Sequence, residues 1–413
     1  MIASAIIGIW FARYIGVSEF GIWSYSLSIL ALGLPFVNLG INNILLTELS
    51  KGSQTDEQIQ TYMMNAIALK VISSVIFVSS VILYCFLATE DTITKIVLLI
   101  LSFQSFFQAA DVFDVYYQSR TESKNTVKIK FISFSLVSVI KIIALITKCS
   151  LELFALIALL ETVVATVIIL IYYVKYSQKK LPKYNIKFSI IKSLLLRGWP
   201  FLIAELLIVF YTRLDQIMIK NMIGEEELAR YSAAVRLSEI WYFIPVAVCV
   251  SVYPTLVKLK ESDGLQFNNG VQKLFNILAF ISISVAIVTT FISDYVALFL
   301  YGEAYRGTGA ILAIHIWTGV AVFLGVGSGY WLILNGLQKY SLLQTISGAL
   351  VNIILNFVLI PKYLGVGAAI STLIAQTVAT IVATTLVSKT RPIFTLQMKA
   401  ILNIFRPAVK NYF

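Results

Sequence analysis

Charged residues are scarce in this sequence. Asp, Glu, Lys and Arg make up 13% of its 413 residues, and 59% of the residues are hydrophobic. A soluble globular domain carries about 25% charged residues, so the composition excludes that class. With one histidine and no Gly-rich phosphate-binding loop, neither a catalytic constellation nor a built-in ATPase is expected. Cys85, Cys149 and Cys249 lack metal-ligand spacing, and we expect no enzyme activity, no cofactor and no metal site.

Long hydrophobic runs are what the sequence has in abundance. A membrane-spanning helix needs about 20 mainly apolar residues, and this rule predicts an all-α polytopic membrane protein with about twelve transmembrane helices. The predicted spans lie near 1–12, 21–47, 62–88, 94–117, 127–147, 153–174, 199–222, 231–257, 271–292, 308–334, 342–360 and 365–387. The first run is short, which leaves open whether the sequence begins upstream. No basic residue precedes it, so it is interpreted as a span and not as a signal peptide.

Lysine and arginine are distributed unequally between the connecting segments. If the N-terminus is cytoplasmic, the inward segments carry 21 of them and the outward segments carry seven. This bias predicts that both termini are cytoplasmic. It also accounts for the net charge of +11 without a nucleic acid partner, for which the sequence lacks recognition motifs.

The longest polar interruption divides the predicted spans into two groups of six. We expect an N-terminal six-helix bundle at 1–175, a basic cytoplasmic linker at 176–198, a C-terminal six-helix bundle at 199–388 and a basic cytoplasmic tail at 389–413. Part of the linker, FSIIKSLLL, and part of the tail, FTLQMKAILNIF, are either interfacial helices or solvated loops.

The two halves resemble each other at one short stretch. IGVSEFGIWSYS (15–26) can be aligned with IGEEELARYSAA (223–234). Because six spans return the chain to the same side of the membrane, the bundles are predicted to be related by a pseudo-two-fold axis along the membrane normal.

The fourth predicted span carries a stripe of polar side chains: Gln104, Gln108, Asp111, Asp114 and Gln118. At 100° per residue they share one face, which cannot meet lipid tails. Bonding between neighbouring helices is one interpretation. Five such groups in one stripe favour a hydrated cavity.

Other predicted spans contain ionised groups at depths where each charge costs roughly 2.5–3.5 kcal/mol. Arg213 and Asp215 are two residues apart, point to different sides and need separate partners. Arg236 and Glu239 are three apart, so they can form a static ion pair with one another. The others are Lys70, Lys141 and Glu205. Snorkelling is the alternative for the two lysines, whereas a polar route across the membrane suits a transporter or a pore.

Several stretches together resemble the Wzx-type O-antigen flippases, the polysaccharide exporters of the multidrug/oligosaccharidyl-lipid/polysaccharide superfamily. They are ARYIGVSEFGIWSYS, RLDQIMIKNMIGEEELARYSAAVRLSE, YPTLVK, LFLYGEAY and VNIILNFVLIPKYLGVGAAISTLIAQ, and they cover both halves. The resemblance implies two bundles around a central charged cavity. It further implies alternating-access transfer of an undecaprenyl-pyrophosphate-linked oligosaccharide, an O-antigen or other surface polysaccharide repeat unit, from the cytoplasmic to the periplasmic leaflet of the bacterial inner membrane.

The resemblance also implies roles for the charged residues. Cavity cations would bind the anionic substrate; the candidates are Arg213, Arg236, Lys70, Lys141 and Arg13. Coupling to a proton or sodium ion, or a polar cavity lining, would use Asp215, Glu239, Asp111, Asp114, Glu205, Gln104 and Gln108. The expected partners are the lipid-linked oligosaccharide, membrane lipids, a polysaccharide polymerase and a chain-length regulator.

Two alternatives remain. A multidrug or organic-cation efflux antiporter of the same fold would be expected to have an acidic, aromatic pocket, and cations such as Lys70 and Arg213 count against it. An O-antigen polymerase or ligase needs a sizeable external loop, and every predicted outward connection is short.

Overall fold

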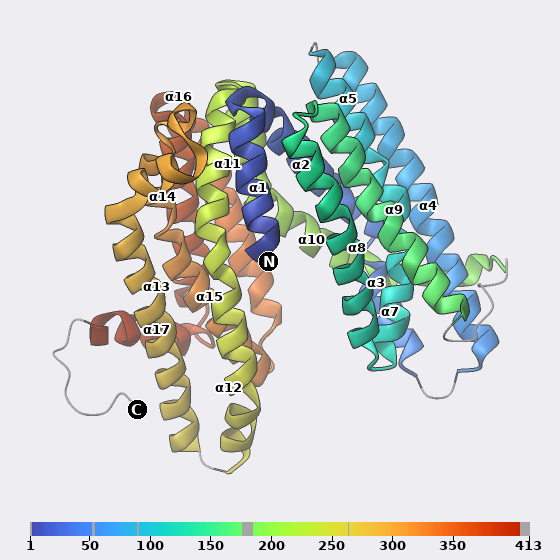
Figure 1. Ribbon diagram of the computed structural model, residues 1–413. Helices are drawn as coiled ribbons and strands as arrows, with labels where there is room; N and C mark the ends of the chain where they lie inside the picture. Colours follow the sequence, from blue (N-terminus) through green and yellow to red (C-terminus); the bar gives the residue numbers. More distant parts are fainter. Residues whose placement is uncertain (1, 52–53, 89–90, 176–184, 263, 405–413) are drawn as a thin grey trace. The chain divides into compact units, whose positions relative to one another are not determined.

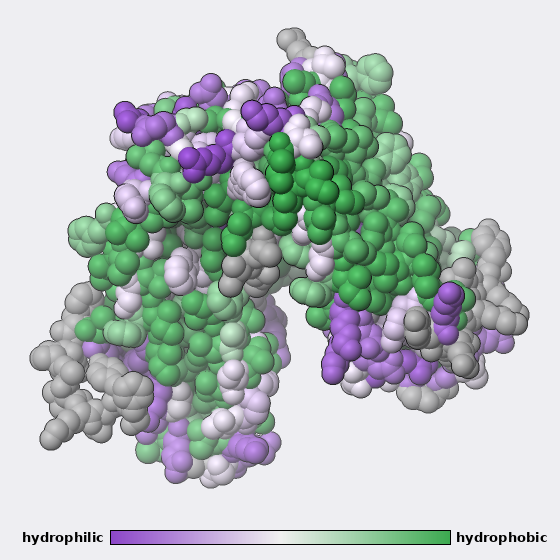
Figure 2. All heavy atoms as spheres, viewed as in Figure 1, coloured by the Kyte–Doolittle hydropathy of each residue, from purple (hydrophilic) through white to green (hydrophobic). Residues whose placement is uncertain are grey.

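The structure, a computed structural model, describes residues 2–51, 54–88, 91–175, 185–262 and 264–404. All regular secondary structure in these residues is helical (Figure 1). Ten segments are long and apolar enough to cross a membrane. In both parts of the chain, hydrophobic residues cover the helices over most of their length and hydrophilic residues gather toward the helix ends (Figure 2). The chain is therefore an all-α polytopic membrane protein, as its composition predicted.

The chain forms two compact units. Unit 1 comprises Met1–Ile15 and Ile22–Val209, and unit 2 comprises Gly16–Gly21 and Phe210–Phe413. The division at Val209 lies inside α10 (Phe188–Met222), whereas the sequence suggested a boundary in a linker at 176–198. FSIIKSLLL is the first part of this continuous helix and not a separate interfacial segment. Residues 176–184 of the expected linker and 405–413 of the expected tail lie outside the described residues.

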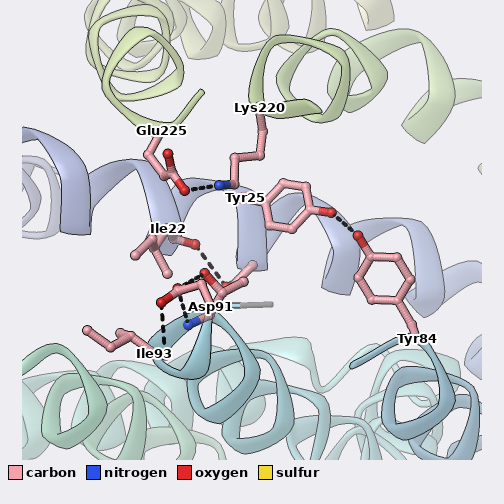
Figure 3. A network of polar contacts seen from close by, with 9 residues as sticks. Ile22, Tyr25, Tyr84, Asp91, Ile93, Lys220 and Glu225 are labelled. Atoms are coloured by element: carbon pink, nitrogen blue, oxygen red, sulfur yellow. Dashed lines mark hydrogen bonds and ion pairs between the residues drawn. The ribbon is translucent and has the colours of Figure 1, made fainter. Parts of the chain in front are cut away.

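Unit 1 contains the first group of helices. They are α1 (Ile2–Ile15), most of α2 (Val17–Asn38), α3 (Ile41–Leu49), α4 (Asp56–Leu87), α5 (Thr92–Ser102), α6 (Gln104–Gln108), α7 (Asp111–Ser119), α8 (Ser123–Ile146), α9 (Leu151–Lys175) and the first part of α10. Polar caps fix two of the starts: Thr55 caps α4 in a capping box with Gln58, and Asp91 caps α5 by accepting from the amides of Ile93 and Thr94 (Figure 3). Tyr25 of α2 and Tyr84 of α4 are joined by a hydrogen bond in the same unit.

The second predicted span is shorter than expected. It ends at Asn38 and not near 47, because Leu39 and Gly40 have left-handed φ angles of 53° and 64°. At this corner, a Cβ on Gly40 would collide with the Gly198 carbonyl of α10, and a Cβ on Gly198 would lie 2.6 Å from the Leu39 oxygen. Glycine at both positions therefore allows α10 to pack against the corner.

The fourth predicted span, near 94–117, is one helical segment over Thr92–Ser119 that is less regular than the sequence predicted. Tight turns at Phe103 and at Ala109–Ala110 separate α5, α6 and α7, and the residues in these turns keep right-handed helical angles. Hydroxyls on neighbouring helices bind carbonyls in this stretch: Ser74 donates to the oxygen of Ser105 at 2.9 Å, and Thr166 to that of Phe107 at 3.2 Å. Such partners are what permits irregular backbone at membrane depth.

Unit 2 contains the second group of helices. They are the last part of α10, α11 (Glu225–Glu239), η1 (Ile240–Tyr242), α12 (Phe243–Ser262), α13 (Gly264–Tyr301), η2 (Glu303–Tyr305), α14 (Thr308–His315), α15 (Thr318–Leu334), α16 (Lys339–Thr380), η3 (Val382–Thr385) and α17 (Arg391–Ile404). An ion pair between Lys220 and Glu225 connects the end of α10 to the start of α11 (Figure 3). In the tail, α17 buries Ile393, Gln397 and Ala400.

The helix ends in unit 2 differ from the predicted spans. The eighth span begins at Glu225 instead of 231 and includes the turn η1, and the tenth is interrupted between His315 and Thr318. The eleventh and twelfth spans lie in α16, which has a corner at Leu364 with φ 55°. This merger, together with the short apolar helix Ser4–Ile15, explains why ten segments meet the length criterion when twelve were predicted.

The two aligned stretches share a local conformation. Gly16 and Gly224 have positive φ angles of 90° and 133°, and a helix begins directly after each, at Val17 and Glu225. Glycine adopts such angles without steric cost. This correspondence supports an internal repeat.

Candidate functional site

Unit 1 contains a polar cavity of about 630 Å³. Gln104 and Gln108 of α6 and Asp111 and Asp114 of α7 line it, so four predicted cavity residues are brought together. The turns on either side of α6 keep right-handed helical angles, so the four residues stay on one face, as their spacing predicts. Gln118, the fifth residue of the predicted stripe, is exposed and does not line the cavity.

Two ion pairs lie at this cavity. Asp114 pairs with Lys130 of α8, and Glu161 of α9 pairs with Lys141. Sequence reasoning counted Lys130 only among the inward basic residues, at the start of the span predicted near 127–147, and overlooked Glu161, although a single carboxylate within the apolar run LFALIALLETVVATV was an available signal. Lys141 is thus neutralised by a carboxylate within unit 1.

Lys70 does not snorkel. It is fully buried in α4, and its Nζ donates to the Oδ1 of Asn38 at 3.2 Å. The carboxylate charges that act on it are those of Asp111, Glu205 and Asp114, the strongest first. Glu205 comes from the part of α10 that belongs to unit 1. The buried ammonium is therefore compensated by three acidic groups that the sequence had identified separately.

The arginines of unit 2 are arranged differently. A terminal nitrogen of Arg213 lies 4.0 Å from a carboxylate oxygen of Glu239. The half-buried guanidinium of Arg236 lies over the ring of Phe20, 5.1 Å from its centroid. Glu239 was expected to be able to pair with Arg236, three residues away on the same helix. The ion pair formed is with Arg213 instead, and Arg236 makes a cation–π contact.

Asp215 lies in a buried polar network. Only 3% exposed, it accepts hydrogen bonds from the Tyr231 hydroxyl, from the Gln216 amide at 2.7 Å and from the Thr372 hydroxyl at 3.5 Å. Asn352 donates to Thr372 at 3.4 Å, and Asn356 donates to Asn352 at 2.9 Å. Asp215 and Arg213 thus have separate partners, as their spacing predicts. Sequence reasoning missed Tyr231 and Thr372.

Two further residues lie outside these groups. The candidate Arg13 is exposed in the last turn of α1, in unit 1. His315, the single histidine, is buried, and its Nδ1 lies 2.6 Å from the Ser238 hydroxyl. This is the arrangement of a satisfied packing residue.

Glu48 of α3 lies between two predicted spans and forms an ion pair with Arg197 at the start of α10. Its carboxylate is 2.5 Å from Arg197 and 2.6 Å from Lys51. Burial raises the pKa of Glu48, but hydrogen bonds from Lys51 and Arg197, together with their charges, outweigh burial, and the pKa lies below its ordinary value. This contact fixes the start of α10 within unit 1.

Comparison with known proteins identifies relatives in polysaccharide biosynthesis. The family described as "Polysaccharide biosynthesis protein" matches residues 1–260. The chain is 28% identical over 213 residues to the capsular polysaccharide biosynthesis protein CapF of Staphylococcus aureus, over 51% of this chain and 53% of that protein. It is 26% identical over 182 residues to the probable flippase AglR of Haloferax volcanii, over 42% of this chain and 37% of that protein. The chain thus spans about half, or less, of the length of these relatives.

Solved structures share the fold over nearly the whole chain. The lipid II flippase MurJ in an inward closed conformation has 17% identity and a TM-score of 0.74, covering 100% of this chain and 92% of that one. A multidrug resistance MATE family transporter in an inward-facing conformation has 14% identity and a TM-score of 0.73, covering 99% and 96%. At these identities the likeness establishes the fold alone. Because the family match extends over more than half of the 413 residues, this membrane protein belongs to the polysaccharide biosynthesis protein family.

Proposed function

We propose that this protein is a flippase that moves a lipid-linked oligosaccharide, a repeat unit of an O-antigen or another surface polysaccharide, from the cytoplasmic to the outer leaflet by alternating access. Family membership supports a role in polysaccharide biosynthesis, and the name of the relative AglR supports lipid flipping. We infer an undecaprenyl pyrophosphate carrier and a bacterial inner-membrane location. The bias of Lys and Arg supports cytoplasmic termini.

The observation that carries the proposal is that the two arginines of unit 2, Arg213 and Arg236, have no hydrogen-bond acceptor among the described residues. Within the described residues, Arg236 donates no hydrogen bond, and the 4.0 Å between Arg213 and Glu239 is too long for one. Each guanidinium has five N–H donors, and the two positive charges act on one another. Polar groups withdrawn from water are costly unless they find acceptors; this cost falls mainly on the half-buried Arg236, because the Arg213 side chain is 37% exposed. A diphosphate would supply acceptors and negative charge to both guanidinium groups.

The lysines that the sequence grouped with these arginines are less available. Lys141 is paired with Glu161, and Lys70 is held by Asn38 among carboxylates. We therefore assign recognition of the anionic diphosphate to Arg213 and Arg236, and we do not assign it to the lysines of unit 1.

Transport by purified protein in proteoliposomes tests this assignment, with a fluorescent undecaprenyl-pyrophosphate-linked oligosaccharide as the probe. We expect Arg213→Ala to abolish translocation while the protein still inserts into the membrane. Arg213→Lys should keep part of the translocation activity, because the lysine ammonium retains the positive charge but lacks the planar, bidentate donors of a guanidinium. Arg306→Ala is the matched control, since Arg306 is 79% exposed and pairs with Glu303 outside the spans. Normal translocation by Arg213→Ala would contradict the proposal.

We further propose that Asp215 couples transport to a proton or a sodium ion. Its carboxylate lies close to the hydroxyl of Thr372, and Asn356, connected to Thr372 through Asn352, has a buried Oδ1 without a hydrogen-bond partner. No group of three His, Cys, Asp or Glu side chains that could hold a metal occurs among the described residues. One carboxylate with hydroxyl and amide oxygens suits a small hard cation or a proton better than a transition metal.

Gradient dependence tests the coupling. Asp215→Asn should make translocation insensitive to imposed sodium and proton gradients, whereas Glu261→Gln, at an exposed carboxylate near the end of α12, should leave the response unchanged. An unaltered gradient response in Asp215→Asn would remove Asp215 from the mechanism.

The fold shared with a MATE transporter keeps organic-cation efflux as the second candidate. The unpaired donors of Arg236 disfavour a cationic ligand, because like charges repel. Efflux of ethidium from proteoliposomes, without movement of the lipid-linked oligosaccharide, would favour this candidate.

A further inference from the structure

We propose that the polar cavity of unit 1 is a binding site for an uncharged sugar residue. The inference rests on the proposed function, since the sugar would belong to the oligosaccharide being carried. It assigns the sugar to unit 1, separately from the diphosphate at the arginines of unit 2.

The cavity presents the chemical groups that bind sugars. Carboxylates, amides and hydroxyls that can exchange hydrogen bonds with sugar hydroxyls are contributed by Asp111, Asp114, Glu161, Gln104, Gln108, Ser133, Thr162 and Thr166. Phe107 and Phe134 add apolar ring surface against which the C–H face of a sugar ring can pack. The volume of about 630 Å³ lies within the range of small-molecule sites, about 300–1,000 Å³.

Two polar groups at the cavity have no partner in the protein. Gln104 is only 9% exposed and lines the cavity, and within the described residues its side-chain amide makes no hydrogen bond. The Oδ1 of Asp114 is also buried without a hydrogen-bond partner, while the other oxygen of that carboxylate binds Lys130. Buried polar groups are nearly always hydrogen-bonded, so the Oδ1 of Asp114 indicates a ligand that donates a hydrogen bond, and the amide of Gln104, which is open to the cavity, can bind a group that donates or accepts. A hydroxyl group can do both.

The balance of charge around the cavity distinguishes among ligands. Of the three carboxylates that line the cavity, Asp114 pairs with Lys130 and Glu161 pairs with Lys141. The third, Asp111, is acted on by the charge of Lys70, which also acts on Glu205 outside the lining. A site for a free cation would require surplus negative charge, and a site for an acidic sugar would require surplus positive charge. The carboxylates and lysines at this cavity balance one another in charge, and some polar groups are still free to form hydrogen bonds. These two properties fit a neutral ligand with several hydroxyl groups.

Helical spacing explains how the groups converge. The amides on α6 and the carboxylates on α7 are separated by a turn at Ala109–Ala110, where both residues keep right-handed helical angles. Side chains spaced three or four residues apart along such a segment share one face. The four polar side chains therefore meet in one space.

Saturation-transfer NMR on the full chain in nanodiscs tests the site, with N-acetylglucosamine and glucuronate as separate probes. We expect transfer to N-acetylglucosamine, reduced roughly fivefold in Gln104→Leu through loss of one hydrogen-bonding group. Gln118→Leu, on the same predicted span but exposed, should match the wild type. Asp114→Asn frees Lys130, so it should increase the response of glucuronate relative to N-acetylglucosamine, which misfolding would not do.

The outcomes separate this inference from the proposed function. Equal N-acetylglucosamine signals in the wild type and Gln104→Leu, or no signal in the wild type, would overturn the sugar site. An unchanged probe preference in Asp114→Asn would also overturn it. Loss of translocation in Arg213→Ala, with normal translocation and sugar binding in Gln104→Leu, would leave the flippase proposal standing without the site. If the sugar signals change as expected in Gln104→Leu and Asp114→Asn, but the protein translocates no lipid-linked oligosaccharide, the sugar site would stand without the flippase proposal.

Discussion

Replacing Arg236 by glutamine separates a role in binding from a role in stability. In the described residues this guanidinium has no hydrogen-bond acceptor, and its contact with the Phe20 ring is at 5.1 Å. Losing that cation–π contact costs about 0.5–2 kcal/mol. Removing a half-buried charge that lacks an acceptor offsets part of the cost. We therefore expect only a small change in the unfolding temperature of Arg236→Gln.

The effect on transport should be much larger. A hydrogen bond to a charged group contributes about 1.5–3 kcal/mol, and each 1.4 kcal/mol corresponds to about tenfold in an equilibrium constant. If Arg236 binds the diphosphate, the translocation rate at limiting substrate should fall by about 10- to 100-fold. The translocation rate of Arg236→Lys should lie between those of Arg236→Gln and the wild type, because lysine keeps the positive charge but loses the bidentate donors of the guanidinium.

The assay measures initial translocation rates in proteoliposomes, normalised to folded protein, beside thermal unfolding of the same preparations. Phe20→Leu is the matched control: it removes the ring, which is buried, but keeps the guanidinium, so it should lower stability more than it lowers transport. A wild-type rate in Arg236→Gln, or a fall in rate no larger than its loss of folded protein, would refute the assignment of this arginine to the substrate.

Two further predictions concern the ion pairs of unit 1. Because the folded-state pKa of Glu48 lies below its ordinary 4.5, its contribution to stability is complete above about that pH and is lost as the pH falls through the lower, folded-state value. Glu48→Gln should therefore lower the unfolding temperature at pH 7, and the difference from the wild type should shrink in acid; a difference independent of pH would show that the contact contributes no charge-linked stability. Lys141→Ala should destabilise the protein by leaving Glu161 without its ion-pair partner, and adding Glu161→Ala should restore part of the loss. Additive losses in that double-mutant cycle would mean that the two residues do not interact.

Composition and hydrophobic length determined the fold class and nearly all of the membrane helices, because twenty apolar residues in sequence have few alternatives to spanning a bilayer. The same reasoning found most of the buried charges, since each one stands out in an apolar run. It also anticipated that Arg213 and Asp215 would have separate partners, because two residues of helix rotate a side chain to another face. It did not find the turns around α6, where the segment contains neither glycine nor proline and the carbonyls of Ser105 and Phe107 accept hydrogen bonds from Ser74 and Thr166 elsewhere in the chain.

Partner choice was what only the tertiary structure decided. Spacing along α11 allowed Glu239 to pair with Arg236, yet it pairs with Arg213 from α10. Lys130, which sequence reasoning counted only toward the inward charge bias, pairs with Asp114. Local sequence fixes which helix face a charge occupies, because the geometry of one helix is regular. The identity of the group opposite that face depends on which helices pack together, and this is set by contacts between residues far apart in the chain.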